Sequence, residues 1–338
     1  DINFSNLLDY FSNKISKDEL QGVFYLDGNK NLFINKGIGR IKKPEELPLP
    51  AHDLLKIKHY NEPFLPKPFA LIQSARGCPY ACNFCVRSYG TRLALRSPES
   101  IIEEIKLLID LHKIKSFRFI DDTFTATSKR VIRFCKLVVD NNIQIKWTCL
   151  SRADTLDEEM ISWMKKAGCV RVYIGIESGS PKILKLIDKE IDLDKGLENI
   201  RLLQKHDIQT TAFYMVGYPD ETEEDFQMSL DYARKGNFDF VIPGRFIAYP
   251  GTKYYDDNKE QVDFSLFPYK NEFKDKRLIK TGVEREKIFY RNFYFRFRYV
   301  GKIWKKLVAH PVEIINNSLK TIHFQLPSKS NKVRNDYI

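Results

Sequence analysis

Residues 77–85 read Gly77-Cys78-Pro79-Tyr80-Ala81-Cys82-Asn83-Phe84-Cys85 and place three cysteines in one short loop. The spacing C-x3-C-x2-C allows Cys78, Cys82 and Cys85 to converge on one inorganic centre, and no fourth cysteine lies near them in the sequence. A structural zinc site usually has four protein ligands, whereas three thiolates suit an iron–sulfur cluster with one iron open to another molecule. The loop therefore predicts a [4Fe-4S] cluster with these three cysteines as metal ligands and catalytic residues.

The composition of the whole chain indicates a globular protein. The chain has 338 residues, is 43% hydrophobic and carries a formal net charge of +11. This size suits one large α/β domain with additions or two smaller domains. No apolar run approaches the ~20 residues that cross a bilayer, and the six cysteines do not resemble a disulfide framework, so we expect a cytoplasmic location. The positive charge permits binding to nucleic acid, anionic lipid or an anionic substrate and does not choose among them.

Strand-like and helix-like segments alternate from residue 69 onward. The strand-like segments are 69–76, 116–121, 145–152, 171–178, 209–217 and 240–249. The first helix has clear start signals, because Ser97 can cap it and Pro98 suits its first turn. Further helices are expected near 128–141, 156–167, 193–206 and 222–236, with a shorter one from Ser180-Pro181. Six β/α units result, which could form an open doubly wound sheet or a partial barrel.

The segments on either side of this alternation have other patterns. Residues 2–11 show helical spacing of apolar side chains, and β-prone runs at 23–26 and 32–34 flank a turn, which predicts a helix and a hairpin. Six prolines between residues 36 and 68 predict an irregular connector. Residues 289–306 are aromatic and basic. We favour a helix that packs its aromatic side chains on the α/β domain, with base stacking or lipid contact as alternatives.

Charged residues follow several predicted strands at their carboxyl ends, where parallel α/β folds bind ligands. Asp121 and Asp122 follow the second strand and could accept hydrogen bonds from an ammonium group, although a helix N-cap is an alternative for one of them. Arg152 ends the third strand and could grip a carboxylate or form a surface ion pair. Glu177 and Ser178 end the fourth strand.

The cysteine loop, with Phe84 before its last cysteine, resembles the radical S-adenosylmethionine (SAM) superfamily. Further segments in matching order carry the resemblance: Asp121-Asp122-Thr123-Phe124, Glu177-Ser178, Met215-Val216-Gly217-Tyr218-Pro219 and Tyr249-Pro250-Gly251-Thr252. The Asp-Asp-x-Phe and Pro-Gly-Thr segments are similar to the branch of the superfamily that is associated with cobalamin-binding domains. The first glycine of the superfamily's adenine segment is missing, because Phe213 stands in its place.

This resemblance implies an α/β fold built on a partial (β/α)6 TIM-like barrel, with an N-terminal helix and hairpin remnant and a C-terminal helical extension. It also implies SAM as a cofactor. The implied SAM contacts are the ammonium group with Asp121 and Asp122, the carboxylate with Arg152, the ribose with Glu177 and Ser178, and the adenine with Val216, Gly217 and Pro219. Tyr80 and Phe84 are expected as walls of the SAM pocket.

The implied reaction is reductive cleavage of SAM at the cluster, which yields a 5′-deoxyadenosyl radical that abstracts a substrate hydrogen. Within the cobalamin-associated branch we expect methyl transfer or ring formation on an unknown substrate. The expected partners are that substrate and an electron donor such as flavodoxin or ferredoxin. Nucleic acid is not expected as a partner, and peripheral membrane contact is not favoured.

The same branch suggests how the chain divides. Residues 1–40 are similar to the last part of a cobalamin-binding domain, 41–68 to the proline-rich connector that follows it, 69–252 to the radical SAM core, and 253–338 form a mostly helical extension. We therefore expect a piece that lacks most of the N-terminal cobalamin (B12) domain, and cobalamin is a candidate cofactor of the full-length protein.

Two other functions share some of these features. A non-catalytic metal-binding and nucleic-acid-binding module would hold zinc in the cysteine loop and nucleic acid on residues 289–306. Methylthiolation of tRNA would use the same barrel together with a second cluster of three cysteines, and Cys135, Cys149 and Cys169 are too dispersed to form one. Both alternatives rank below the radical SAM interpretation.

Overall fold

The structure, a computed structural model, describes residues 2–20, 22–26, 29–35, 44–62, 65–263 and 272–294. The chain divides into two compact units, which we call the N-terminal unit (Asp1–Leu49 with Ala94–Arg96) and the barrel unit (Pro50–Leu93 with Ser97–Ile338). The predicted aromatic and basic segment lies outside the described residues from residue 295 onward.

The N-terminal unit contains the predicted helix and hairpin. Its helix α1 (Ile2–Phe11) precedes the antiparallel strands β1 (Val23–Leu26) and β2 (Leu32–Asn35). The unit also includes two 3-10 helices, Lys17–Glu19 and Pro44–Glu46, and the short strand β5 (Ala94–Leu95). Phe4, Leu8 and Phe11 lie at helical spacing on α1 and stay 64%, 51% and 70% exposed. The amphipathic pattern of α1 is therefore present, but its apolar side chains are not covered.

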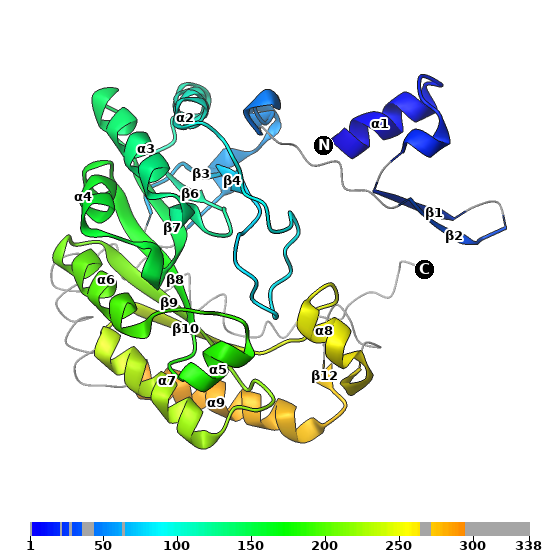
Figure 1. Ribbon diagram of the computed structural model, residues 1–338. Coiled ribbons are helices and arrows are strands. Elements are labelled where there is room, and N and C mark those ends of the chain that lie inside the picture. Colours follow the sequence, from blue (N-terminus) through cyan, green and yellow to red (C-terminus); the bar gives the residue numbers. More distant parts are fainter. Residues whose placement is uncertain are drawn as a thin grey trace. The chain divides into compact units, whose positions relative to one another are not determined.

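Six parallel strands form the sheet of the barrel unit (Figure 1). They are β3 (Phe69–Ile72), β6 (Ser116–Phe119), β7 (Lys146–Arg152), β8 (Cys169–Glu177), β9 (Gln209–Val216) and β10 (Phe240–Arg245). Their order in the sheet follows their order in the chain, so right-handed crossovers place the connecting helices on one face. A doubly wound sheet would reverse its strand order. The sheet is therefore a partial (β/α)6 barrel with β3 and β10 at its edges.

The predicted helices cover the outer face of this sheet. They are α2 (Pro98–His112), α3 (Ser128–Asp140), α4 (Glu158–Lys166), α5 (Pro181–Leu186), α6 (Leu193–Lys205) and α7 (Glu223–Gly236). Ser97 accepts a hydrogen bond from the backbone N–H of Ser100 at 3.2 Å, which confirms the predicted cap of α2. Between sheet and helices, Trp147 is fully buried and packs against several phenylalanine rings, at centroid distances of 5.6 to 6.4 Å.

Two predicted strands are shorter than the sequence indicates by four residues each. The segment 69–76 is divided into β3 and the short strand β4 (Ala75–Arg76), because the carboxylate of Asp121 binds the backbone N–H groups of Ser74 and Ala75 at 2.7 and 2.9 Å. These groups are therefore not part of a continuous strand. The predicted strand 240–249 ends at Arg245. A turn follows, in which Thr252 Oγ1 donates to the carbonyl of Tyr249 at 2.6 Å.

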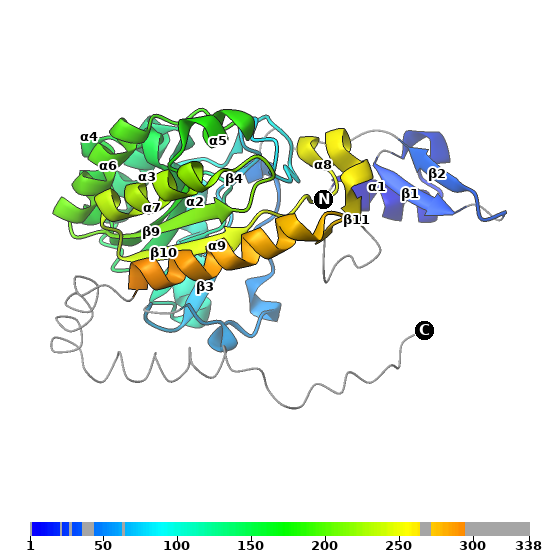
Figure 2. The ribbon, with the colours of Figure 1, turned by 90° about the horizontal axis from the view of Figure 1, so that it is seen from below.

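The segments beside the barrel strands are held by side-chain contacts. The connector contains the 3-10 helices His52–Leu54 and Ile57–His59, and buried His52 meets Glu104 of α2 at 2.8 Å. The described part of the C-terminal extension comprises α8 (Lys253–Asn258), the 3-10 helix Lys259–Gln261, β11 (Val262–Asp263), β12 (Glu272–Phe273) and α9 (Lys276–Tyr294). Figure 2 shows α9 running along β9 and β10, with fully buried Phe289 on the ring of Tyr214 at 4.7 Å. Among the described helices, none has the length and apolar character of a membrane span.

Candidate active site

A cavity of about 480 Å³ lies against the inner face and carboxyl ends of the barrel strands. The cysteine loop forms one wall. The other lining residues are Asp122, Thr123, Leu150, Ser151, Arg152, Tyr173, Gly175, Glu177, Lys189, Phe213, Tyr214, Met215, Ile242, Gly244 and Arg245. The cavity therefore combines an apolar sheet surface with a small set of charged side chains, as binding sites for organic molecules do.

All three cysteines of the loop line this cavity, and none forms a disulfide. The backbone N–H of Cys78 donates to the carbonyl of Gly90 at 3.1 Å. Asn83 anchors the other half of the loop, because its side chain donates to the carbonyl of Leu186 at 2.7 Å. Gly77 has a positive φ of 85°, and a side chain there would collide with the carbonyl of Arg92. These contacts fix the conformation of the loop.

The environment of Cys82 and Cys85 favours the neutral form of their thiols. Burial raises the pKa of Cys82, and burial together with the neighbouring Cys82 and Asp122 raises the pKa of Cys85 to about 11. Metal ligation requires the thiolate form of cysteine, so a metal bound by these side chains would have to stabilise the negative charge that the protein does not.

The donor set suits a cluster better than a single ion. Within the described ranges, no three His, Cys, Asp or Glu side chains are grouped so that they could hold one metal ion. In a [4Fe-4S] cluster each cysteine thiolate binds a different iron, so the sulfur atoms do not have to surround a single metal ion. Three unpaired thiols around one cavity are compatible with that arrangement, and the zinc-loop alternative finds no support in this geometry.

The two aspartates after β6 lie in different environments. Asp121 is 1% exposed and does not line the cavity, because its carboxylate is bonded to Ser74 and Ala75. Asp122 does line the cavity, and burial raises the pKa of its carboxyl. Of the two aspartates, Asp122 is therefore the one that lines the cavity.

Arg152 lines the cavity but is already engaged by a carboxylate. Its Nε and Nη2 donate to the two oxygens of Asp154 at 3.0 and 2.9 Å, and its side chain is only 6% exposed. Its guanidinium also lies 3.9 Å from the ring centroid of Tyr80. The structure therefore contains the ion pair that was the alternative role of Arg152, although Arg152 is buried and the pair is not at the surface. Tyr80 and Phe84 both line the cavity, as expected of its walls.

Glu177 has a partner that the sequence pattern did not reveal. Lys189 follows α5 and donates to Glu177 Oε1 at 3.0 Å, with both side chains at the cavity. Glu177 has a positive φ of 66°, and a β-bulge interrupts the pairing of β8 with β9 beside it. A side chain at Gly175 would overlap both Glu177 and Lys189, so this glycine provides the space for the ion pair.

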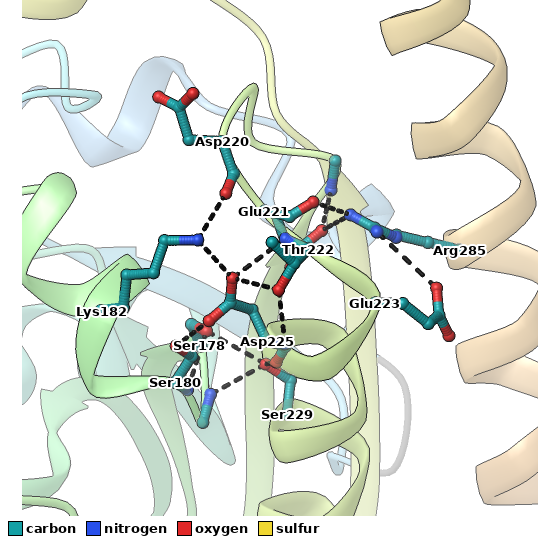
Figure 3. A network of polar contacts seen from close by, with 12 residues as sticks. Ser178, Ser180, Lys182, Asp220, Glu221, Thr222, Glu223, Asp225, Ser229 and Arg285 are labelled. Atoms are coloured by element: carbon teal, nitrogen blue, oxygen red, sulfur yellow. Dashed lines mark hydrogen bonds and ion pairs between the residues drawn. The ribbon is translucent and has the colours of Figure 1, made fainter.

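Ser178 belongs to a buried polar network behind the cavity (Figure 3). Its hydroxyl lies 3.0 Å from that of Ser229 and accepts the backbone N–H of Ser180 at 3.1 Å. Asp225 accepts hydrogen bonds from Ser180 Oγ at 2.6 Å and from Lys182 Nζ at 2.8 Å. The network ties the start of α5 to the start of α7, and Ser178 does not line the cavity.

The predicted adenine segment also lies beside the cavity lining. Val216 is fully buried in the core, and neither Gly217 nor Pro219 lines the cavity. The N–H of Gly217 donates to Glu221 Oε2 at 2.8 Å, and Arg285 of α9 donates to the same oxygen at 2.6 Å (Figure 3). The segment is thus held in place by helix α9.

Comparison with known proteins identifies the family of this chain. The model of the family described as "Radical SAM superfamily" matches residues 72–233, a range that contains the cysteine loop and the ends of β6 to β9. The chain belongs to the radical SAM superfamily.

Relatives of this radical SAM chain include proteins named as methyltransferases and cyclases. It is 33% identical to an "Uncharacterized methyltransferase" of Pyrococcus horikoshii over 76% of this chain and 56% of the relative. It is 25% identical to the "Anaerobic magnesium-protoporphyrin IX monomethyl ester cyclase" of Cereibacter sphaeroides over 83% of this chain and 47% of the relative. The chain spans about half the length of the curated relatives that it matches.

A solved radical SAM structure has the same fold. The cobalamin-dependent enzyme OxsB, determined with aqua-cobalamin and S-adenosylmethionine bound, matches with a TM-score of 0.68 and 17% identity. The match covers 97% of this chain and 56% of OxsB. At this identity the likeness supports the fold and carries no residue assignment.

Several lining residues of the radical SAM cavity have no sequence motif. Lys189, Tyr173, Phe213, Ile242 and Arg245 all line it. Tyr173, Phe213 and Ile242 lie on strands, where side chains alternate between the two faces of the sheet, and that period of two was the only available signal. It could not distinguish the inner face from the outer face.

Proposed function

We propose that this chain binds a [4Fe-4S] cluster and SAM in the cavity and generates a 5′-deoxyadenosyl radical from SAM. The observation that supports this most strongly is the meeting of three unpaired cysteines with Asp122, Glu177 and Lys189 in one cavity. Cys78, Cys82 and Cys85 would hold the cluster. When bound, the cluster supplies the electron that cleaves SAM, and an electron donor has to provide it.

The other residues of the chain would bind and orient SAM. Asp122 is placed to accept hydrogen bonds from its ammonium group, and Lys189 to donate to its carboxylate. Glu177, which is held by Lys189, can accept hydrogen bonds from ribose hydroxyls. Tyr80 and Phe84 would exclude water from the reacting atoms.

Not every implied SAM contact has the same support. Arg152 would act mainly by holding Tyr80 and the cavity wall in place, because its Nε and Nη2 already donate to the carboxylate of Asp154. Asp121, Ser178, Val216, Gly217 and Pro219 would support the strand ends from outside the lining. A direct contact of these five residues with SAM stays a prediction.

The relatives support a proposal for the reaction class. We infer methyl transfer or ring formation within the cobalamin-associated branch, because a methyltransferase and a cyclase are among the relatives and OxsB binds cobalamin. Residues 1–40 would then be the last part of a cobalamin-binding domain, 41–68 a connector, 69–252 the catalytic core, and 253–338 an extension. We place the enzyme in the cytoplasm, where reduced thiols persist.

Anaerobic reconstitution with iron and sulfide tests this proposal. The reconstituted protein should show cluster absorbance and, after reduction, convert SAM to 5′-deoxyadenosine. A variant with alanine at positions 78, 82 and 85 should lose both properties. Cys135→Ala is the matched control, because Cys135 is buried on α3 away from the cavity. Formation of 5′-deoxyadenosine by the triple variant would refute the site assignment.

A further inference from the structure

The segment around the cysteine loop carries positive charge that no acidic residue beside it in the sequence balances. Residues 76–93 contain three arginines and no Asp or Glu, whereas the whole chain has 44 acidic residues among 338. Of these arginines, Arg92 is exposed and Arg87 is partly exposed. Within the described ranges, neither of these two side chains has a hydrogen bond or an ion pair. Both cations are therefore available to an outside molecule.

These two arginines belong to a turn that is packed on the cysteine loop. Residues 86–92, which we call the arginine turn, begin directly after Cys85. The N–H of Gly90 donates to the carbonyl of Arg87 at 2.9 Å, which closes the turn. The carbonyl of Gly90 accepts the N–H of Cys78 at 3.1 Å. The arginine turn is thus fixed to both ends of the cysteine loop.

The arginine turn also exposes apolar side chains. Val86 is 45% exposed and Tyr89 is 46% exposed. The guanidinium of Arg76 lies 5.2 Å from the centroid of the Tyr89 ring, so the ring has a fixed neighbour although it is open to solvent. Tyrosine and arginine are enriched among the residues that contribute most to binding between proteins. The turn therefore presents a surface that suits a protein partner.

The position of the arginine turn relative to the cavity connects it with electron delivery. None of its residues lines the cavity, whereas the three cysteines do. Under the proposed function SAM occupies the cavity, so an electron donor has to approach the cysteine loop from another side. Electron transfer between two proteins is fast only over short distances. The arginine turn meets this requirement, because it contacts Cys78 and is joined to Cys85 by a peptide bond.

We propose that the arginine turn is the docking surface for the protein that delivers the electron, and that this donor is acidic around its redox group. Arg87 and Arg92 would pair with carboxylates of the donor, and Val86 and Tyr89 would form the apolar centre of the contact. One electron passes from the donor, which is oxidised, to the cluster, which is reduced, and no atom is transferred. This assignment rests on the proposed function, because it assumes that the three cysteines hold a redox-active cluster.

Binding of flavodoxin, a small acidic flavin protein, tests this surface directly. The dissociation constant would be measured by fluorescence anisotropy of dye-labelled flavodoxin with the reconstituted protein, at about 50 mM and about 300 mM salt. The double variant Arg87→Gln with Arg92→Gln, the arginine variant, should raise this constant about fivefold or more at the lower salt concentration, because two charge pairs are lost. The difference should shrink at the higher concentration, since salt screens exposed charges.

Two further variants separate local charge from overall charge and from apolar contact. Lys195→Gln with Arg201→Gln is the matched control, because it removes two exposed cations from helix α6. This control should bind flavodoxin as the unchanged protein does. Tyr89→Ala should weaken binding by a similar factor at both salt concentrations, because it removes mainly apolar contact.

The rate of 5′-deoxyadenosine formation shows whether the docked donor is productive. With reduced flavodoxin in limiting amount, the arginine variant should react about fivefold more slowly than the unchanged protein. With photoreduced 5-deazariboflavin, a small donor that needs no docking surface, the two proteins should react at the same rate. Equal slowing with both donors would overturn the proposal, because the arginines would then act on the cluster site itself.

Three binding results would also overturn the proposal. The unchanged protein could fail to bind flavodoxin, or the arginine variant could bind it equally well. The third result concerns a competing occupant. If the arginine variant lost affinity for a labelled single-stranded oligonucleotide and kept its affinity for flavodoxin, the turn would be a nucleic-acid surface.

The proposed function fails by a different result. Flavodoxin binding that depends on Arg87 and Arg92, without 5′-deoxyadenosine from either donor, would refute radical generation and leave the docking surface in place.

Discussion

Lys189 is the single residue whose role in SAM binding is most open to a direct test. It is 5% exposed and its only described partner is Glu177, so it can contribute a charge-assisted hydrogen bond to a carboxylate in the cavity. We expect Lys189→Met to raise the dissociation constant of SAM by about tenfold or more, measured by calorimetry on the reconstituted protein.

Lys185→Met is the matched control for this variant. Lys185 is an exposed lysine on α5, four residues before Lys189, and does not line the cavity. It should bind SAM as the unchanged protein does. Similar affinities for SAM in both variants would show that Lys189 acts only on Glu177 and not on SAM.

Asp225 gives the protein a pH-dependent part of its stability. Burial alone would raise the pKa of its carboxyl, but hydrogen bonds from Lys182, Ser180 and Thr222 outweigh this and lower the pKa well below its usual range. A depressed folded-state pKa stabilises the fold above the unfolded pKa of about 3.9, and this stabilisation is lost as the pH falls below that value.

The variant Asp225→Asn measures this contribution. We expect it to lower the free energy of unfolding by about 1–2 kcal/mol at pH 7, because it removes the charge that Lys182 and the α7 cap bind. The difference between the two proteins should shrink below pH 4 in urea unfolding experiments. A difference that stayed constant down to pH 3 would show that the carboxylate charge is not involved.

At the scale of elements, the contact between the end of β9 and helix α9 depends on glycine. Gly217 has a φ of 76°, and a Cβ there would lie 2.6 Å from the Cα of Gly282. We expect Gly217→Ala to lower the free energy of unfolding by about 2–4 kcal/mol, because backbone strain adds to a collision with backbone atoms. Gly282→Ala is the matched control. Its Cβ would meet only Arg245 at ordinary distances, and alanine favours the helix, so the stability should be unchanged or slightly higher.

The ion pair between α9 and the turn after β9 provides a second test of this contact. Glu221 is fully buried and its Oε2 accepts hydrogen bonds from Arg285 and from the N–H of Gly217. Arg285→Met leaves this carboxylate without its cation, so we expect a loss of about 3–5 kcal/mol in urea unfolding. The double variant Arg285→Met with Glu221→Gln should recover part of that loss. Additive losses would mean that the two residues do not act as a pair.

The sequence predicted the elements better than it predicted the cavity. Hydrophobic periodicity identified each barrel strand, and Ser97 and Ser180 cap the helices expected of them. The break after Ile72 was not predictable, because it depends on Asp121, which is 47 residues away from Ser74 in the chain. The sequence also did not reveal that Lys189 and Arg245 line the cavity, because residues that are distant in the chain form the cavity with them.

The choice between a barrel and a doubly wound sheet also needed information beyond local pattern. Both folds have the same alternation of strands and helices, and only the order of strand pairing distinguishes them. The order β3-β6-β7-β8-β9-β10 resolved this point. The three cysteines were predictable because their ligand spacing is local, whereas a buried aspartate such as Asp121 and a cavity aspartate such as Asp122 look alike in sequence.

At the scale of the whole molecule, the barrel unit contains all parts of the candidate site. Every residue that lines the cavity lies between Cys78 and Arg245, and every buried member of the largest core cluster lies between Ile57 and Phe289. The described residues that line the cavity and those that form this core all belong to the barrel unit. The N-terminal unit instead carries the exposed apolar side chains of α1.

Deletion of residues 1–49 should therefore leave the site functional. We expect residues 50–338 to bind the same amount of iron per chain as residues 1–338, and to bind SAM with a dissociation constant within about twofold, because no described cavity contact is lost. Binding of a fluorescent apolar dye should decrease, since Phe4, Leu8 and Phe11 are removed. Iron analysis, calorimetry and dye fluorescence measure these three quantities. Loss of iron from the shortened protein would show that the N-terminal unit stabilises the cysteine loop, and the barrel unit would then not be self-sufficient.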